Sequence, residues 1–97
     1  MHLSFQHWCS RCDKCFSDIN DIYNFPYYVF CKRCVQIIYY SYYKKYNSLL
    51  KMNEFDKLDI TNSIYFLPLS LKEKERIAEI DFIKKDGELF FSNNNFL

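Results

Sequence analysis

Five cysteines are the residues of this chain whose type and spacing could do chemistry. They occur at positions 9, 12, 15, 31 and 34 of a chain of 97 residues. Positions 12 and 15 form one C-x-x-C pair, positions 31 and 34 form a second, and fifteen residues separate the two pairs. This spacing is typical of a four-cysteine zinc site, because each short pair reaches two corners of a tetrahedron with Zn–S bonds of ~2.3 Å. We therefore predict one structural Zn²⁺, held by Cys12, Cys15, Cys31 and Cys34.

Cys9 is left over in this arrangement. It either joins Cys12 in an alternative first pair, as an alternative metal ligand in place of Cys15, or is an ordinary half-buried thiol, which is the interpretation we favour. His7 lies two residues before Cys9, a spacing poorly suited to joint ligation or to a catalytic dyad. We expect both histidines, His2 and His7, at the surface or at an interface.

An iron–sulfur cluster is the main rival to zinc. Cys9, Cys12 and Cys15 form C-x2-C-x2-C, which resembles the start of a ferredoxin cluster motif, although the usual following Cys-Pro is missing. A disulfide framework is disfavoured, because the cysteine count is odd and the N-terminal residues do not form a secretory signal. Unrelated buried thiols are the remaining alternative. Zinc is the interpretation that we prefer.

A long helix is predicted over residues 34–51, opening at the second cysteine pair. Its N-terminal backbone N–H groups and dipole would stabilise thiolates there. Ile37, Tyr40 and Tyr43 lie opposite the main apolar stripe, so the helix is apolar on nearly all sides and needs neighbours on nearly all sides. The stripe consists of Val35, Ile38, Tyr39, Tyr42, Tyr46, Leu49 and Leu50.

Shorter elements surround this helix. Residues 27–30 and 63–67 are predicted strands. Ser70 and Glu73 have the spacing of a capping box, which opens a second helix continuing over residues 75–83. Asp86-Gly87 either ends that helix or forms the turn of a hairpin joining residues 81–85 to 88–91, and we favour the helix.

A zinc knuckle, a hairpin-like loop and a second cysteine pair opening a helix resemble the treble-clef class of zinc finger over residues 12–50. Phe16 stands where a glycine usually follows the first pair. The resemblance implies a small α+β fold: a treble-clef-like knuckle, a long helix, a shorter second helix and short strands. We expect residues 1–52 to form the zinc-binding module, and residues 53–97 an extension packed on it or on a partner, within a single domain.

Composition excludes several functions. Gly87 is the only glycine, whereas phosphate-binding loops need several. No pair of residues suits acid–base or nucleophilic work, so we expect no enzyme. The formal charge is +1, which disfavours a protein that neutralises many phosphates. The sequence contains no apolar run long enough for a transmembrane helix, and we expect a reducing intracellular compartment.

Partner contacts are predicted on the aromatic helix. Tyrosine is enriched at protein interfaces, and the candidates are Tyr40, Tyr43, Lys44 and Lys45. The alternative is a nucleic-acid-associated module in which tyrosines stack on bases. In that case, the phosphate contacts would come from Lys32, Arg33, Lys44 and Lys45.

The Tyr- and Phe-rich composition resembles that of small proteins encoded in ciliate mitochondrial DNA. This resemblance implies a subunit of a mitochondrial respiratory complex, such as complex I. We therefore expect a non-catalytic, zinc-stabilised structural subunit of a large protein assembly. The alternatives are a zinc-binding protein of a mitochondrial ribosome or viral transcription apparatus, and an iron–sulfur electron-transfer protein.

Overall fold

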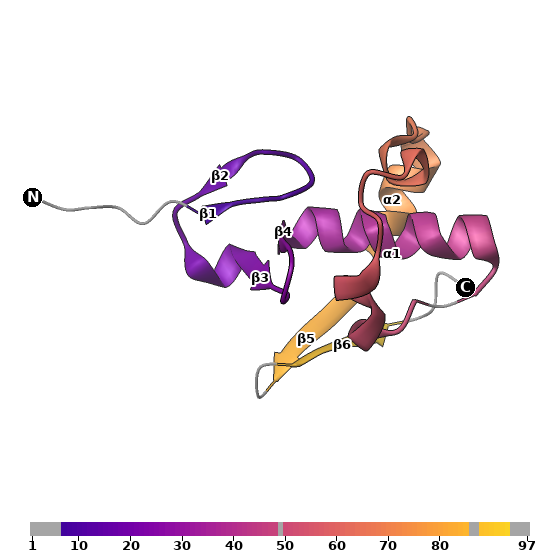
Figure 1. Cartoon of the computed structure of the whole chain (residues 1–97). Helices are drawn as coiled ribbons and strands as arrows, with labels where there is room; N and C mark the ends of the chain where they lie inside the picture. The colour runs from indigo at the N-terminus through magenta and orange to yellow at the C-terminus, as the bar shows by residue number, and fades with distance from the viewer. Residues whose placement is uncertain (1–6, 49, 86–87, 94–97) are drawn as a thin grey trace, which may run out of the picture.

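Two α-helices, three short 3₁₀ helices and three two-stranded antiparallel sheets make up the part of the chain that the computed structural model describes, residues 7–48, 50–85 and 88–93 (Figure 1). The long helix α1 runs through the middle of the molecule. Strands β1 to β4 gather at its N-terminal end, α2 lies on one side of it, and β5 and β6 lie on another. The expected small α+β class is confirmed.

The cysteine-bearing region folds as two successive hairpins. The first pairs β1 (His7–Trp8) with β2 (Cys15–Phe16), and Trp8 lies opposite Cys15. After a 3₁₀ turn, η1 (Ile19–Asp21), the second pairs β3 (Ile22–Asn24) with β4 (Val29–Cys31). The strand expected at residues 27–30 is thus present, shifted toward Cys31.

Helix α1 (Lys32–Tyr46) follows β4 directly, with Cys31 as its N-cap. It begins two residues before the expected start and ends five residues before the expected end. Asn47 ends it, because its backbone adopts the left-handed conformation (φ 51°) and its N–H donates to the carbonyl of Tyr43. Asparagine is one of the few residues that tolerate this conformation.

Neighbours surround the N-terminal half of α1. Every residue from position 34 to position 39 is buried, the polar Gln36 included. The side chain of Gln36 donates to the carbonyl of Ile80 at 2.7 Å. The expectation that this helix needs packing partners all round holds for this half. Toward the C-terminal end, Tyr42 is half-buried and Tyr46 is exposed; Leu49 lies outside the described residues.

Between α1 and α2, the described residues (47–48 and 50–70) contain no strand, and the prediction of a strand at residues 63–67 is wrong. This segment forms two 3₁₀ helices, η2 (Met52–Lys57) and η3 (Ser63–Phe66). The side chain of Asn62 accepts a hydrogen bond from the N–H of Ile64. Such a local side-chain bond starts a turn in competition with extended structure, and Pro68 follows soon after.

Helix α2 (Leu71–Ala78) opens at the predicted capping box. The hydroxyl of Ser70 accepts from the N–H of Glu73, and the carboxylate of Glu73 accepts from the N–H of Ser70. The helix does not continue to residue 83, however. Residues 80, 81 and 82 alternate buried, exposed and buried, which is the period of a strand.

The C-terminal hairpin consists of β5 (Asp81–Lys85) and β6 (Glu88–Asn93). Our preference for a helix here is wrong, and the hairpin alternative is right. Its turn, residues 86–87, lies outside the described residues. None of the described helices is long and apolar enough to cross a membrane.

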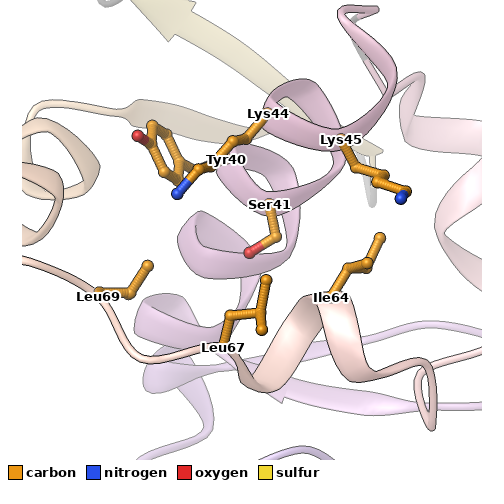
Figure 2. Close-up of a pocket in the computed structure, with 7 residues that line it drawn as sticks. All are labelled: Tyr40, Ser41, Lys44, Lys45, Ile64, Leu67 and Leu69. Atoms are coloured by element: carbon orange, nitrogen blue, oxygen red, sulfur yellow. The ribbon is translucent and has the colours of Figure 1, made fainter.

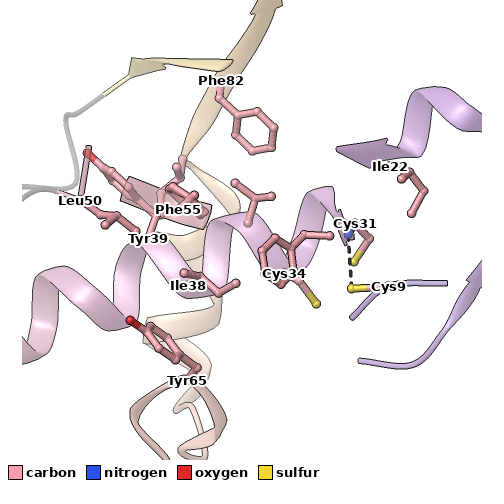
Figure 3. Packing of buried hydrophobic residues seen from close by; sticks show 13 residues of the cluster. Cys9, Ile22, Cys31, Cys34, Ile38, Tyr39, Leu50, Phe55, Tyr65 and Phe82 are labelled. Atoms are coloured by element: carbon pink, nitrogen blue, oxygen red, sulfur yellow. Dashed lines mark hydrogen bonds between the residues drawn. The ribbon is translucent and has the colours of Figure 1, made fainter. Parts of the chain in front are cut away.

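A single buried cluster joins both halves of the chain around α1 (Figure 3). The cysteines at its N-terminal end belong to this core and are not a surface appendage. The cluster consists of Cys9, Ile22, Phe30, Cys31, Cys34, Val35, Ile38, Tyr39, Leu50, Phe55, Tyr65, Ile80 and Phe82.

Candidate metal centre

Four cysteines converge at the N-terminal end of α1. The Sγ atoms of Cys9, Cys12, Cys31 and Cys34 all lie within 4.8 Å of one another. Three of these residues are buried and Cys12 is half-buried. Figure 3 shows the side chains of Cys9, Cys31 and Cys34 where β4 passes into α1. All the cysteines are free thiols, so the cluster is a set of four sulfur donors around a common point.

The set differs from the predicted one at a single position. Cys12, Cys31 and Cys34 are brought together as expected, but the fourth sulfur comes from Cys9. Cys15 is exposed on β2 and lies outside the cluster. Cys9 is fully buried, whereas we had favoured an ordinary half-buried thiol. His7, on β1, is also outside the cluster.

Hydrogen bonds between the first loop and β4 decide this choice. The N–H of Ser10 donates to the carbonyl of Val29 at 2.6 Å, and the N–H of Val29 donates to the hydroxyl of Ser10 at 3.0 Å. These bonds hold the 9–12 loop against the strand that leads into Cys31. The N–H of Cys31 then donates to Sγ of Cys9 at 3.3 Å (Figure 3). The returning strand β2 carries Cys15 away.

One signal in the sequence could have identified Cys9. Asp13, directly after Cys12, has φ of 58° and donates its N–H to the carbonyl of Cys9 at 2.9 Å. Asp is among the few residues other than glycine that tolerate the left-handed conformation. A glycine is usual after the second cysteine of a zinc knuckle. Phe16 stands there after Cys15, whereas Asp13, which meets the same conformational requirement, follows Cys12. The resulting separation of the two pairs, eighteen residues between Cys12 and Cys31, also suits a four-cysteine site.

Helix α1 fixes the position of the second cysteine pair, Cys31 and Cys34. Cys31 is the N-cap residue, and Cys34 lies in the first turn. The first backbone N–H groups of a helix lack partners within it, and the dipole makes this end positive. Both features favour thiolate over thiol, and thiolate is the form that ligates a metal.

The spacing of the sulfur atoms fits a single tetrahedral ion. Sulfurs at the corners of a zinc tetrahedron with Zn–S bonds of ~2.3 Å lie ~3.8 Å apart. The Sγ atoms of Cys12 and Cys31 are 4.0 Å apart, and no pair in the cluster exceeds 4.8 Å. A multi-atom iron–sulfur cluster needs a wider separation, because its iron and sulfide atoms lie between the cysteine sulfurs. The geometry therefore favours one ion over a cluster.

The pKa values of the clustered thiols are shifted in opposite directions. Hydrogen bonds from the thiols of Cys31 and Cys34 hold the pKa of Cys9 well below its ordinary value. Cys34 lowers the pKa of Cys31, but the adjacent Cys9 thiolate and burial outweigh this and raise it to about 11. The pKa of Cys34 is also raised, through its hydrogen bonds with Cys31 and Cys9 and through burial. Without an ion, Cys9 is therefore the thiolate and the thiols of Cys31 and Cys34 donate hydrogen bonds to it. A divalent ion bound at this point would take the place of the thiol protons and release them.

Basic side chains surround the sulfur cluster. They line a cleft of about 380 Å³ that includes three of the cluster cysteines and one acidic residue, Asp21. Four thiolates around a divalent ion would carry two negative charges, which the nearby cations compensate. These cations are Arg11, Lys14, Lys32 and Arg33.

Arg11 contacts the cluster directly. Its Nη1 lies 3.4 Å from Sγ of Cys34, and its Nε and Nη2 both donate to the carbonyl of Tyr65. The guanidinium also stacks over the ring of Phe66, 5.0 Å from its centroid. One side chain thus connects the sulfur cluster to η3.

The predicted partner-contact residues lie farther along α1. The hydroxyl of Tyr40 and the ammonium of Lys44 both donate to Oε2 of Glu73, at 3.2 and 2.6 Å. Tyr43 is half-buried against the core, and Lys45 is exposed. The structure therefore assigns Tyr40 and Lys44 an internal role at the α1–α2 contact. Whether these residues also meet a partner stays a prediction.

No protein-family model, curated protein or solved structure significantly matches this chain.

Proposed function

We propose that this chain is a non-catalytic structural subunit of a larger protein assembly, and that one Zn²⁺ bound by Cys9, Cys12, Cys31 and Cys34 stabilises its fold. The observation that carries the proposal is the convergence of four sulfur atoms within 4.8 Å at the start of the central helix.

A structural role suits a site closed by four protein ligands. Catalytic zinc keeps one coordination position for water or substrate, whereas four cysteines fill the tetrahedron. A chain of 97 residues buries a smaller share of its surface on folding than a large domain does, so an additional link adds substantially to its stability. A zinc ion held by four thiolates contributes on the order of 10 kcal/mol to such a fold. The ion would join the first loop, β4 and α1 at one point.

Exposed apolar side chains support membership of an assembly. Tyr27 is 77% exposed and Leu71 is 73% exposed, and it is clusters of such side chains, rather than single ones, that mark protein contacts. The other exposed large apolar residues are Trp8, Ile19, Tyr46, Phe66 and Leu67. The choice of a mitochondrial respiratory complex as host rests on the compositional resemblance alone.

Paired serine variants test the metal centre. We expect elemental analysis of the purified chain to find one zinc per chain, with no colour from iron. The Cys9→Ser variant should lose zinc, whereas the matched Cys15→Ser variant should keep it. Zinc retained by Cys9→Ser and lost by Cys15→Ser would instead support the ligand set predicted from the sequence. Iron with acid-labile sulfide would contradict the zinc assignment.

Isolation from the source cell tests the assembly. A tagged copy of the chain should elute with a large complex in size-exclusion chromatography and keep the same protein partners after a high-salt wash. A chain that elutes as a free monomer under gentle lysis would contradict the proposed subunit role.

A nucleic-acid-associated module is the second candidate, and the cations around the sulfur cluster favour it. Four basic residues and one acid line that cleft. A zinc ion with four thiolates would carry two negative charges, however, and these would neutralise two of the four positive charges. Affinity for RNA or DNA that falls steeply with salt would support this alternative. Affinity that does not change between 50 and 200 mM salt, the range over which phosphate contacts weaken most visibly, would exclude it.

A further inference from the structure

A groove lies between α1 and the segment that follows it, on the described surface beyond the metal centre. Figure 2 shows residues of α1 on one side and residues of η3 and the following stretch on the other. The cavity volume is about 180 Å³. The lining residues are Tyr40, Ser41, Lys44, Lys45, Ile64, Leu67 and Leu69.

The walls of this groove are apolar and one rim is positively charged. Ile64, Leu67 and Leu69 face α1 across the groove, and Leu67 is 54% exposed. Lys44 and Lys45 stand on the α1 side. Among the lining residues, all of which the structure describes, none is acidic. Glu73 already pairs with Lys44, which leaves Lys45 as the more available cation.

The size of the groove narrows the class of ligand. Pockets for drug-sized molecules and cofactors occupy roughly 300–1,000 Å³, and a volume of about 180 Å³ is smaller. It suits one or two aliphatic side chains inserted from a larger body. Peptide segments bind in this way, with anchoring side chains in a groove and charged residues at its rim.

We propose that this groove docks a short segment of a partner protein that carries aliphatic side chains next to carboxylates. The aliphatic side chains pack against Leu67 and Leu69, and a carboxylate pairs with Lys45. Electrostatic complementarity at the rim selects an acidic segment over a basic one. This inference rests on the proposed role as an assembly subunit and names the chemistry of the partner.

The metal centre supports one wall of the groove. Ile64 belongs to η3, and the carbonyl of Tyr65 in the same 3₁₀ helix accepts hydrogen bonds from Arg11, which also contacts Cys34. Loss of the metal would free Cys34 and weaken the position of Arg11. Docking therefore depends on zinc, although no residue that lines the groove is a metal ligand.

Selection from a display library of short random peptides tests the proposal, with the full-length zinc-loaded chain as bait. We expect enriched peptides to combine leucine or isoleucine with aspartate or glutamate. Synthetic copies of these peptides should lose about tenfold or more in affinity toward Leu67→Ser and toward Lys45→Glu, which is the loss expected at a hot-spot contact. Matched variants at exposed positions outside the groove, Ile19→Ser and Lys57→Glu, should bind as the parent chain does.

Other outcomes overturn the proposal. These are no enrichment, enrichment of basic or wholly polar peptides, or peptides that bind the groove variants and the parent equally. Self-association of the parent chain in sedimentation, abolished by Leu67→Ser, would identify a second copy as the occupant instead. Measuring zinc content distinguishes a failure of docking from a failure of the metal centre. Groove variants that keep zinc but no longer bind the peptides test docking alone. A parent chain that has lost zinc and still binds the peptides contradicts the metal dependence.

Discussion

Arg11 places Nη1 of its guanidinium 3.4 Å from Sγ of Cys34. The same side chain donates to the carbonyl of Tyr65, 54 positions away in the sequence. A candidate metal ligand is thereby tied to the second half of the chain through one charged side chain. Hydrogen bonds to metal-bound thiolates stabilise their negative charge and fix their orientation. Arg11 therefore links the candidate metal centre to η3.

Replacing Arg11 by methionine is expected to weaken zinc binding by about tenfold to a hundredfold, the usual cost of losing a side chain that supports a metal ligand. Competition with a chromophoric chelator measures the change. The Lys14→Met variant removes a cation from the same cleft and is the matched control, with little effect expected. Equal losses in both variants would indicate that net charge matters and that the Arg11 contacts do not.

Zinc is expected to raise the melting temperature in a concentration-dependent way. A ligand that binds only the folded state adds RT ln(1 + [L]/Kd), about 4 kcal/mol when the free ligand is a thousandfold above Kd. The Cys15→Ser variant should show the same rise as the parent chain, and Cys34→Ser should show almost none. Calorimetry with and without a chelator checks this. A parent melting curve unaffected by chelation would contradict metal-stabilised folding.

The carboxylate of Glu73 is expected to make stability depend on pH. The hydrogen bond from Lys44, followed by the N–H of Ser70, lowers the pKa of Glu73 to about 2. Because the folded pKa lies below the unfolded value of about 4.3, this stabilisation is complete above that value and is lost as pH falls toward 2. Since Lys44 is 54% exposed, water screens the pair, and its contribution to stability is small.

The Glu73→Gln variant isolates the charge, because glutamine at this position can keep the capping box. We expect its deficit in unfolding free energy relative to the parent to be constant from pH 7 to pH 5 and to begin shrinking below pH 4.5. Urea unfolding of both chains at each pH measures the difference. Loss of metal in acid affects both chains alike. A deficit that grows as the pH falls would contradict the assignment.

Phe55 is expected to be a main contributor to the core. It is fully buried in η2 and stacks on Phe25, with ring centroids 5.3 Å apart. The Phe55→Ala change should cost about 3–5 kcal/mol, because it removes a large buried side chain and leaves a cavity. The exposed Tyr27, changed to alanine, is the control and should cost less than about 0.5 kcal/mol. Chemical denaturation with zinc present measures both.

The sequence was sufficient for features that neighbouring residues create. Ser70 and Glu73 form their capping box because both partners lie within one helical turn. Helix α1 was predictable because its apolar residues recur at helical spacing. Three of the four sulfur donors followed from C-x-x-C spacing, which is a local property of a short loop.

Only the tertiary structure decided the rest. Cys9 displaced Cys15 because Ser10 and Val29, nineteen positions apart, bond to each other and press the 9–12 loop onto β4. Residues 81–85 became a strand because α2 stops at Ala78 and the hairpin buries Phe82 against the core. Arg11 reached Cys34 and Tyr65 only because chain folding brought their segments together. Local spacing determines which groups can act together, whereas long-range hydrogen bonds and burial determine which of them meet.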